Sequence, residues 1–302
     1  MVKAVLFANV ASGRGQKWLF KVIQAAPDAG VDIVSTCFDI SPQGIESGLQ
    51  LAAKEGVPTI LAMGGDGTVG SVANHLLGGD WTLGVLPSGT SNDFARSVGL
   101  PLDPAGALRT VGTGHTAQLD VGVVNGHAFL HAAAVGLNTQ FAREAGKLRT
   151  FLGRLSYPVA AIKVFRDPRP FCARIEAGGT EQEYRALDVI VLNSPIFGGA
   201  LELEAASLGL QDGTASMLIV ERLNLMTLVR ALPLIVERRI LRFPGLEVLA
   251  TSSLRLTTEP PQQITVDGET GDWTPVNIEV RRRALRVLVP AQFASRNDEP
   301  AE

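Results

Sequence analysis

The chain has 302 residues, 46% of them hydrophobic, and its formal net charge at pH 7 is -3. This length predicts one or two domains, because single hydrophobic cores stop growing at about 250–300 residues. The nearly neutral balance argues against a nucleic-acid partner, which would normally require a basic stripe. The two cysteines, Cys37 and Cys172, are far apart, which fits a reducing compartment better than a disulfide scaffold.

Hydropathy predicts no membrane-spanning helix, because no run of about 18 apolar residues occurs in the sequence. The apolar run near the N-terminus, residues 3–8, is too short for the hydrophobic region of a signal peptide. We therefore expect a cytoplasmic protein, which could lie peripherally on the inner face of a membrane. Residues 223–243 mix apolar residues with arginines and predict an amphipathic helix that packs on the core or adsorbs to anionic lipid.

Short apolar runs alternate with helical periodicity over the first third of the chain. This alternation predicts a Rossmann-like lobe with a parallel sheet and helices on both of its faces. Ligands of such sheets bind at the carboxyl ends of the strands. The predicted strands are 3–8, 31–36, 59–63 and 83–86, and the predicted helices are 16–26, a second beginning at 41, 69–77 and 91–98.

The pattern changes near Asp120, after which short strands are separated by turn signals. Asn125-Gly126 is a strong hairpin turn. This half predicts an antiparallel β-sandwich or a barrel-like sheet, so the fold class is α/β plus β. The polar residues 291–302 are expected to form a flexible tail. The predicted strands are 121–124, 127–135, 171–176, 187–192, 214–220, 253–257, 264–266 and 282–289.

The most specific motif is a glycine-rich loop between a predicted strand and a predicted helix. Glycine lets backbone N–H groups approach an anion closely because no Cβ intervenes. The start of the following helix adds a dipole that favours phosphate. Asp66 could hold a cation or its water, and Thr68 could donate to a phosphate oxygen. The motif consists of Gly64, Gly65, Asp66, Gly67 and Thr68.

Two further glycine loops also follow predicted strands. Residues 87–96 read Pro-Ser-Gly-Thr-Ser-Asn-Asp-Phe-Ala-Arg, and residues 9–15 read Asn-Val-Ala-Ser-Gly-Arg-Gly. Ser91 or Asn92 would be an adequate helix N-cap, which is the simplest interpretation of the second loop taken alone. That interpretation does not explain two such loops on adjacent strands, which would converge on one crevice.

With these three loops in order, the sequence resembles the diacylglycerol kinase catalytic-domain family, which includes bacterial soluble lipid kinases and sphingosine-type kinases. The resemblance runs over nearly the whole chain, with Val10 at the position of a usual proline. Family-like segments follow at 152–157, 193–199, 211–213 and 266–269. Where the family continues Gly-Gly-Asp-Gly-Thr with an Asn-Glu pair, this chain has Gly70 and Ser71.

The resemblance implies an ATP cleft between a nucleotide-binding lobe, residues 1–120 with a returning strand at 282–290, and a lipid-substrate lobe, residues 121–281. It implies Mg²⁺ between the phosphates, near Asp66. Asp93 and Asp120 would join a polar network around this ion, and Arg149 stands where the family has a lysine. The residues expected to bind ATP are Asn9, Thr36, Gly64, Gly65, Asp66, Gly67, Thr68 and Thr90.

The resemblance also implies a structural cation in the second lobe, held by Asp212 with the backbone oxygens of Gly209 and Thr214. The last motif is Asp267-Gly268-Glu269, which on its own terms is a tight turn. In the family context Glu269 is expected to be the general base and Asp267 its metal-linked partner.

The expected function is therefore phosphate transfer from ATP to a hydroxyl of a diacylglycerol-like lipid, which the enzyme meets transiently at a membrane surface. One alternative is a relative of NAD-type kinases, which share Gly-Gly-Asp-Gly-Thr. Another is a catalytically degenerate regulator that binds lipid or nucleotide. No Walker motif occurs, so a Walker-type NTPase is not supported. The sequence leaves a homodimer open.

Overall fold

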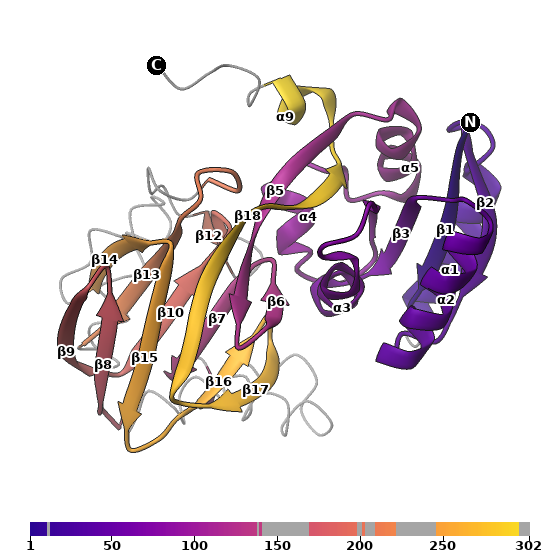
Figure 1. Cartoon of the computed structure of the whole chain (residues 1–302). Helices are drawn as coiled ribbons and strands as arrows, with labels where there is room; N and C mark the ends of the chain where they lie inside the picture. Colours follow the sequence, from indigo (N-terminus) through magenta and orange to yellow (C-terminus); the bar gives the residue numbers. More distant parts are fainter. Residues whose placement is uncertain are drawn as a thin grey trace. The chain divides into compact units, whose positions relative to one another are not determined.

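The computed structural model describes residues 1–10, 13–137, 139–140, 169–197, 201–202, 209–221 and 246–295. The chain divides into two compact units (Figure 1). Unit 1 is built mainly from Met1–Val121 and Arg281–Glu302, and unit 2 from Gly122–Phe197 and Leu201–Val280. Several predicted features lie outside the described residues, namely residues 11–12 of the first loop, Arg149, the segment 152–157, the glycines 198–199 and the helix at 223–243.

Unit 1 contains a parallel sheet in the order β2-β1-β3-β4, to which the end of β18 adds a further parallel strand beside β4. This is a doubly wound order, because β2 is added on one side of β1 whereas β3 and β4 are added on the other, so the strand order reverses between β1 and β3. The strands are β1 Val2–Ala8, β2 Val31–Cys37, β3 Thr59–Gly64, β4 Thr82–Pro87 and β18 Val276–Leu288. The helices are α1 Gly13–Ala25, α2 Pro42–Lys54, α3 Asp66–Leu76, α4 Asp93–Ser97, α5 Pro104–Thr113 and α9 Ala291–Ser295.

Strands β1, β3 and β4 are buried over most of their length, which explains why they are mainly apolar, whereas the edge strand β2 is mostly half-buried and includes Asp32 and Ser35. On one face of the sheet, alternate residues of β1 pack against apolar residues of α1 and α5. On the other face Phe7 lies against α2, where a Cβ on Gly48 would meet the Phe7 ring at 2.5 Å. Ser41 caps α2 and Asp103 caps α5, each with a proline in the first turn.

Unit 2 is a sandwich of two antiparallel sheets whose inner faces share one apolar core. One sheet runs β18-β15-β8-β9, with β5 and β6 attached, and the other runs β14-β13-β10-β7-β16-β17. Strands β8, β15 and β18 form one layer in Figure 1, and β7, β10 and β13 lie in the other. The strands are β5 Thr116–Val124, β6 His127–Phe129, β7 Ala132–Gly136, β8 Phe171–Ala177, β9 Thr180–Ala186, β10 Asp188–Leu192, β11 Ile196–Phe197, β12 Leu201–Glu202, β13 Ala215–Val220, β14 Leu246–Thr251, β15 Ser253–Glu259, β16 Gln263–Val266 and β17 Glu269–Trp273.

The structure corrects several predicted elements. Helix α3 begins at Asp66 rather than Val69, so the end of the glycine motif forms its first turn. The predicted strand 127–135 is two strands, β6 and β7, which belong to different sheets. Part of the predicted flexible tail is helix α9, and residues 296–302 lie outside the described part. Helix α5 and strands β9, β14 and β17 had no predicted counterpart.

Each helix within the described ranges is too short or too polar to span a lipid bilayer.

Candidate active site

The loops after β1 and β3 meet where the strand order reverses. The Asn9 N–H donates to the Met63 carbonyl at 2.9 Å. The Asn9 side-chain Nδ2 donates to Thr68 Oγ1 at 3.0 Å, in the first turn of α3. A Cβ on Gly64 would lie 2.3 Å from the Thr68 Cβ, so this close approach requires glycine. The reversal point is where ligands of doubly wound sheets bind.

The loops after β3 and β4 are in backbone contact. The Ser88 N–H donates to the Gly64 carbonyl at 2.8 Å. A Cβ on Gly89 would lie 2.4 Å from the Gly65 Cα and 3.2 Å from the Gly65 nitrogen. Two glycine loops can therefore present their backbones side by side at the carboxyl ends of neighbouring strands, with no side chain between them.

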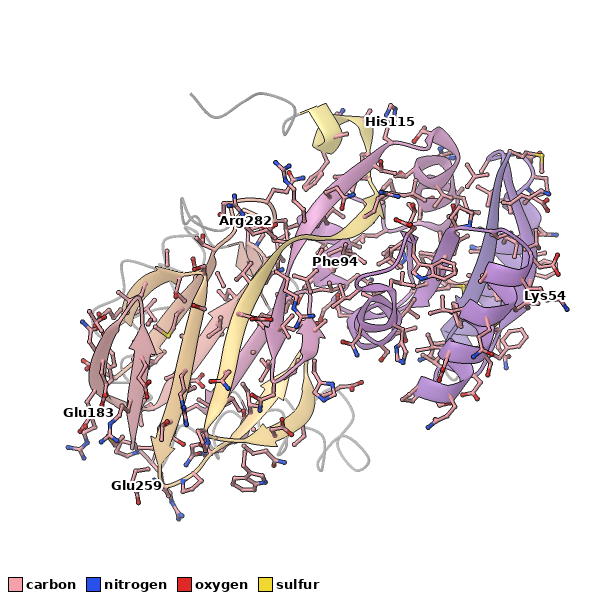
Figure 2. The ribbon with its side chains drawn as sticks, viewed as in Figure 1. Lys54, Phe94, His115, Glu183, Glu259 and Arg282 are labelled. Atoms are coloured by element: carbon pink, nitrogen blue, oxygen red, sulfur yellow. The ribbon has the colours of Figure 1, made fainter. Side chains whose placement is uncertain are left out.

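Asp66 links this region to α4. Its Oδ1 accepts the Phe94 N–H at 3.1 Å, and Phe94 is buried, with 2% of its surface exposed (Figure 2). The adjacent Asp93 is also buried. Asp120 is buried too, and its Oδ1 accepts the Arg283 N–H at 2.7 Å, which ties β5 to the returning strand β18 within unit 1.

Thr36 and Thr90 lie on the outer parts of the same edge. Thr36 pairs with Leu6 near the carboxyl end of β2, and Thr90 is exposed in the loop after β4. Burial raises the pKa of the neighbouring Cys37 thiol, so this side chain stays protonated at neutral pH. Within unit 1, the predicted ATP-binding residues therefore lie either near the carboxyl ends of neighbouring strands of one sheet or in the loops that follow these strands.

In unit 2, Asp267 and Gly268 form a two-residue hairpin turn between β16 and β17, and Glu269 follows this turn and pairs with Val266. Asp267 and Gly268 have positive φ angles of 45° and 87°, as a type I′ turn requires. Glu269 is exposed at the start of β17. Asp267 is held differently, because its carboxylate accepts the N–H groups of Leu130, His131 and Ala132.

Asp212 closes a short loop in unit 2. Its Oδ2 accepts the Gly209 N–H at 2.8 Å, and its Oδ1 accepts the Thr214 N–H at 2.9 Å. The Thr214 hydroxyl donates to the same Oδ1 at 3.0 Å. The described contacts therefore use the N–H groups of Gly209 and Thr214, whereas the sequence analysis expected their backbone oxygens to be cation ligands. In the described ranges, no three acidic, histidine or cysteine side chains lie in an arrangement that could hold a metal ion.

Two family models match the chain one after the other. The diacylglycerol kinase catalytic domain matches residues 3–124. The YegS C-terminal NAD kinase beta sandwich-like domain matches residues 131–289. The chain belongs to the diacylglycerol kinase catalytic-domain family. The predicted family is confirmed, and the chain is by descent a kinase-type transferase.

Individual diacylglycerol kinases are similar to this chain over nearly its whole length. The chain is 29% identical to the diacylglycerol kinase of Bacillus subtilis, over 99% of this chain and 100% of that protein. It is 28% identical to the diacylglycerol kinase of Staphylococcus aureus, over 95% of this chain and 92% of that protein. A solved structure of a diacylglycerol kinase from Bacillus anthracis has a TM-score of 0.76 at 25% identity, over 96% of this chain and 98% of that chain. This likeness confirms the predicted fold class.

The residues of unit 1 fit the nucleotide and the divalent ion that a kinase of this family uses. The close contact between Gly65 and Gly89 brings the backbones of two half-buried glycine loops together, and such backbone N–H groups suit phosphate oxygens. Asp66, with Asp93 beside its hydrogen-bond partner Phe94, supplies hard oxygen donors of the type that Mg²⁺ prefers. At position 71, where the family resemblance implied a glutamate, the Ser71 hydroxyl donates within α3 to the Gly67 carbonyl at 2.9 Å.

Asn92 stands at the N-cap position of α4, one of the two residues that the simplest interpretation of this loop offered as a cap. Its backbone lies in the left-handed region at φ 51°, however, and its side chain makes no cap hydrogen bond. Its side chain instead braces the loop, since Oδ1 accepts the Gly89 N–H at 2.9 Å and Nδ2 donates to the Gly89 carbonyl at 3.1 Å. The tolerance of asparagine for positive φ was the available signal.

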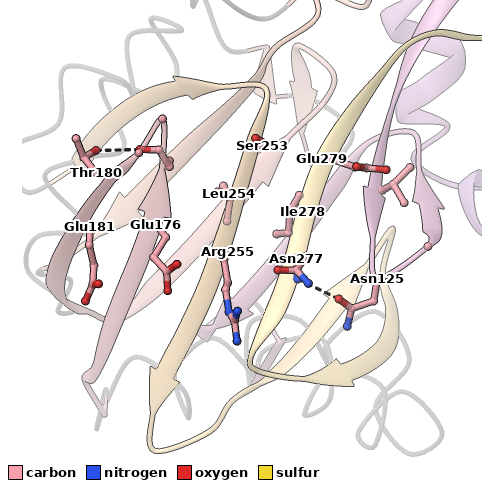
Figure 3. A pocket seen from close by; sticks show the side chains of 15 residues that line it. Asn125, Glu176, Thr180, Glu181, Ser253, Leu254, Arg255, Asn277, Ile278 and Glu279 are labelled. Carbon is pink, nitrogen blue, oxygen red and sulfur yellow. Dashed lines mark hydrogen bonds between the residues drawn. The ribbon is translucent and has the colours of Figure 1, made fainter.

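A groove of about 690 Å³ lies on the outer face of unit 2 (Figure 3). Its floor includes the cross-strand neighbours Glu176, Arg255 and Asn277. Asn125, at the β5–β6 turn, accepts the Asn277 N–H at 3.0 Å. None of the predicted ATP-binding, metal or catalytic residues lines this groove.

We expect Gly89→Ala to weaken ATP binding and to destabilise unit 1 by about 1–3 kcal/mol, as overpacking commonly does. The added Cβ would lie 2.4 Å from the Gly65 Cα and 2.9 Å from Asn92 Oδ1. Because the closer of these contacts is to backbone, no side-chain rotation could relieve it. Calorimetric titration with ATP and Mg²⁺, together with urea unfolding, measures both effects. Wild-type ATP affinity in the variant would separate this loop contact from nucleotide binding.

Proposed function

We propose that this chain transfers the terminal phosphate of ATP to a hydroxyl group of a diacylglycerol-like lipid. The observation that carries the proposal is the convergence of three polar loops on the carboxyl edge of the unit 1 sheet, joined by the Asn9–Thr68 hydrogen bond and the Gly65–Gly89 contact. The relatives described above are named diacylglycerol kinases and align with this chain over nearly their full length, which supports a diacylglycerol-like lipid as the acceptor.

In this proposal, different residues bind the phosphates, hold the metal ion and accept the proton. The glycine backbones and the start of α3 would bind the phosphates, because N–H groups and the helix dipole favour an anion there. Asp66 would hold Mg²⁺, which offsets the phosphate charge during transfer. Glu269, an exposed carboxylate at the start of β17, would accept the proton of the lipid hydroxyl. A cation beside Asp212 remains part of this proposal.

The test is transfer of label from [γ-³²P]ATP to lipid by the full chain. Phosphatidylglycerol vesicles would carry dioleoylglycerol or sphingosine, and a parallel reaction would contain NAD⁺ in place of lipid. We expect label in the organic phase, resolved by thin-layer chromatography as a phosphorylated lipid. Label on NAD⁺ alone would instead support an NAD-type kinase. ATP binding without any transfer would support a regulator.

A further inference from the structure

The turn that carries Glu269 is anchored to a distant segment of unit 2. The Asp267 carboxylate accepts N–H groups from three consecutive residues, at 2.8 Å from Leu130, 3.0 Å from His131 and 2.9 Å from Ala132. The Asp267 N–H donates back to the Ala132 carbonyl at 2.9 Å. Three backbone donors bind one carboxylate in charge-assisted hydrogen bonds. The position of the turn therefore depends on the position of residues 130–132.

Residues 130–132 are themselves held from the far side by the segment after β10. The Asn193 N–H donates to the His131 carbonyl at 2.9 Å, and Asn193 Nδ2 donates to the Leu130 carbonyl at 3.2 Å. His131 Nδ1 lies 2.7 Å from Ser194 Oγ. His131, Asn193 and Ser194 are 8%, 2% and 0% exposed. Buried polar groups of this kind hold a fixed geometry, because each would lose a partner if the segment moved.

Glu269 needs such support because its own strand, β17, is weakly held in the sheet. Among the described strands, β17 pairs with β16 alone, and their register is irregular between Gln263 and Thr265. Glu269 is also exposed, so packing does not fix it. A base must stay within hydrogen-bond reach of the proton that it accepts, and a displacement of about 1 Å can cost about 10²-fold in rate.

We propose that His131, Asn193 and Ser194 form a clamp that positions Glu269, through residues 130–132 and Asp267, for phosphate transfer to the lipid. This inference rests on the proposed function. It makes Asp267 an anchor of the turn, which is a different role from the metal-linked one that the family resemblance implied. The clamp residues act through the backbone and touch neither ATP nor lipid.

The test compares His131→Leu and Ser194→Ala with His131→Asn, in which an amide nitrogen can stand near the position of Nδ1. His127→Leu is the matched control, because His127 is an exposed histidine of the adjacent strand β6. Turnover is measured with [γ-³²P]ATP and dioleoylglycerol in phosphatidylglycerol vesicles, ATP affinity by calorimetry, and hydrogen exchange by mass spectrometry over residues 130–132 and 267–270.

We expect His131→Leu and Ser194→Ala to lower kcat by about 10–10²-fold while ATP affinity stays unchanged. His131→Asn should restore most of the rate, and His127→Leu should match wild type. Exchange should quicken at 130–132 and also at 267–270, which reports the clamp without using activity. Faster exchange confined to 130–132, or wild-type kcat in both disruptive variants, would overturn the clamp. A wild-type chain that transfers no phosphate to lipid would overturn the proposed function, and the exchange result would then still decide whether the clamp holds the turn.

Discussion

Replacing Asp66 by alanine is expected to lower phosphate transfer by about 10²–10³-fold, the cost of removing one preorganised electrostatic group. Two losses contribute. The carboxylate that would hold Mg²⁺ disappears, and the Phe94 N–H loses the Oδ1 acceptor that lies 3.1 Å away. Asp66→Asn separates them, because an amide oxygen still accepts that hydrogen bond but carries no charge. We expect Asp66→Asn to lose nearly as much turnover as Asp66→Ala while keeping wild-type stability.

Asp103→Ala is the matched control for this pair. Asp103 also uses a carboxylate oxygen for a backbone amide, the Gly106 N–H at 2.8 Å, but it caps α5 and lies outside the glycine loops. Its loss should cost about 1 kcal/mol of stability with kcat unchanged. Steady-state kinetics with saturating lipid and urea unfolding measure the two quantities. Wild-type turnover in Asp66→Asn would show that the charge of Asp66 plays no part in transfer.

The parallel half of the fold could be predicted because its inner strands, β1, β3 and β4, are buried over most of their length and are therefore mainly apolar runs. Strand β9 was not predicted, for the opposite reason. Its sequence, Thr-Glu-Gln-Glu-Tyr-Arg-Ala, is exposed over most of its length at the edge of its sheet, so no apolar alternation marks it. Helix α5 did carry a start signal, Asp103 followed by Pro104, but its glycines and threonines are poor helix formers.

The motifs identified the loops of the candidate site but not the contacts between them. Asn9 and Thr68 are 59 residues apart, and Asp267 is 137 residues from Leu130. Such pairings depend on the strand order β2-β1-β3-β4 and on β16 lying beside β7, neither of which a single sequence determines. His131 illustrates the limit, since its role comes entirely from its partners in the folded chain.

Replacing Glu269 by glutamine is expected to preserve the fold and ATP binding and to lower phosphate transfer by about 10²–10⁴-fold, the usual cost of losing a general base. Glutamine keeps the shape and hydrogen-bonding reach of the side chain but cannot accept the proton of the lipid hydroxyl. The type I′ turn should persist, because its geometry depends on Asp267, Gly268 and the Val266–Glu269 pairing rather than on the Glu269 carboxylate. Single-turnover transfer to dioleoylglycerol and calorimetric ATP affinity measure the two sides of this prediction.

Glu259→Gln provides the comparison, because Glu259 is another exposed glutamate at a strand end of unit 2 and takes no part in the candidate site. It should leave both rate and affinity unchanged. The sharpest distinction lies between the two residues of the turn. Asp267→Asn removes the charge that three backbone N–H groups approach, so it should quicken hydrogen exchange at residues 130–132 as well as slow transfer. Glu269→Gln should slow transfer with no change in exchange. If both variants changed exchange and rate together, Glu269 would be a structural residue of the turn, and the base would have to be sought elsewhere.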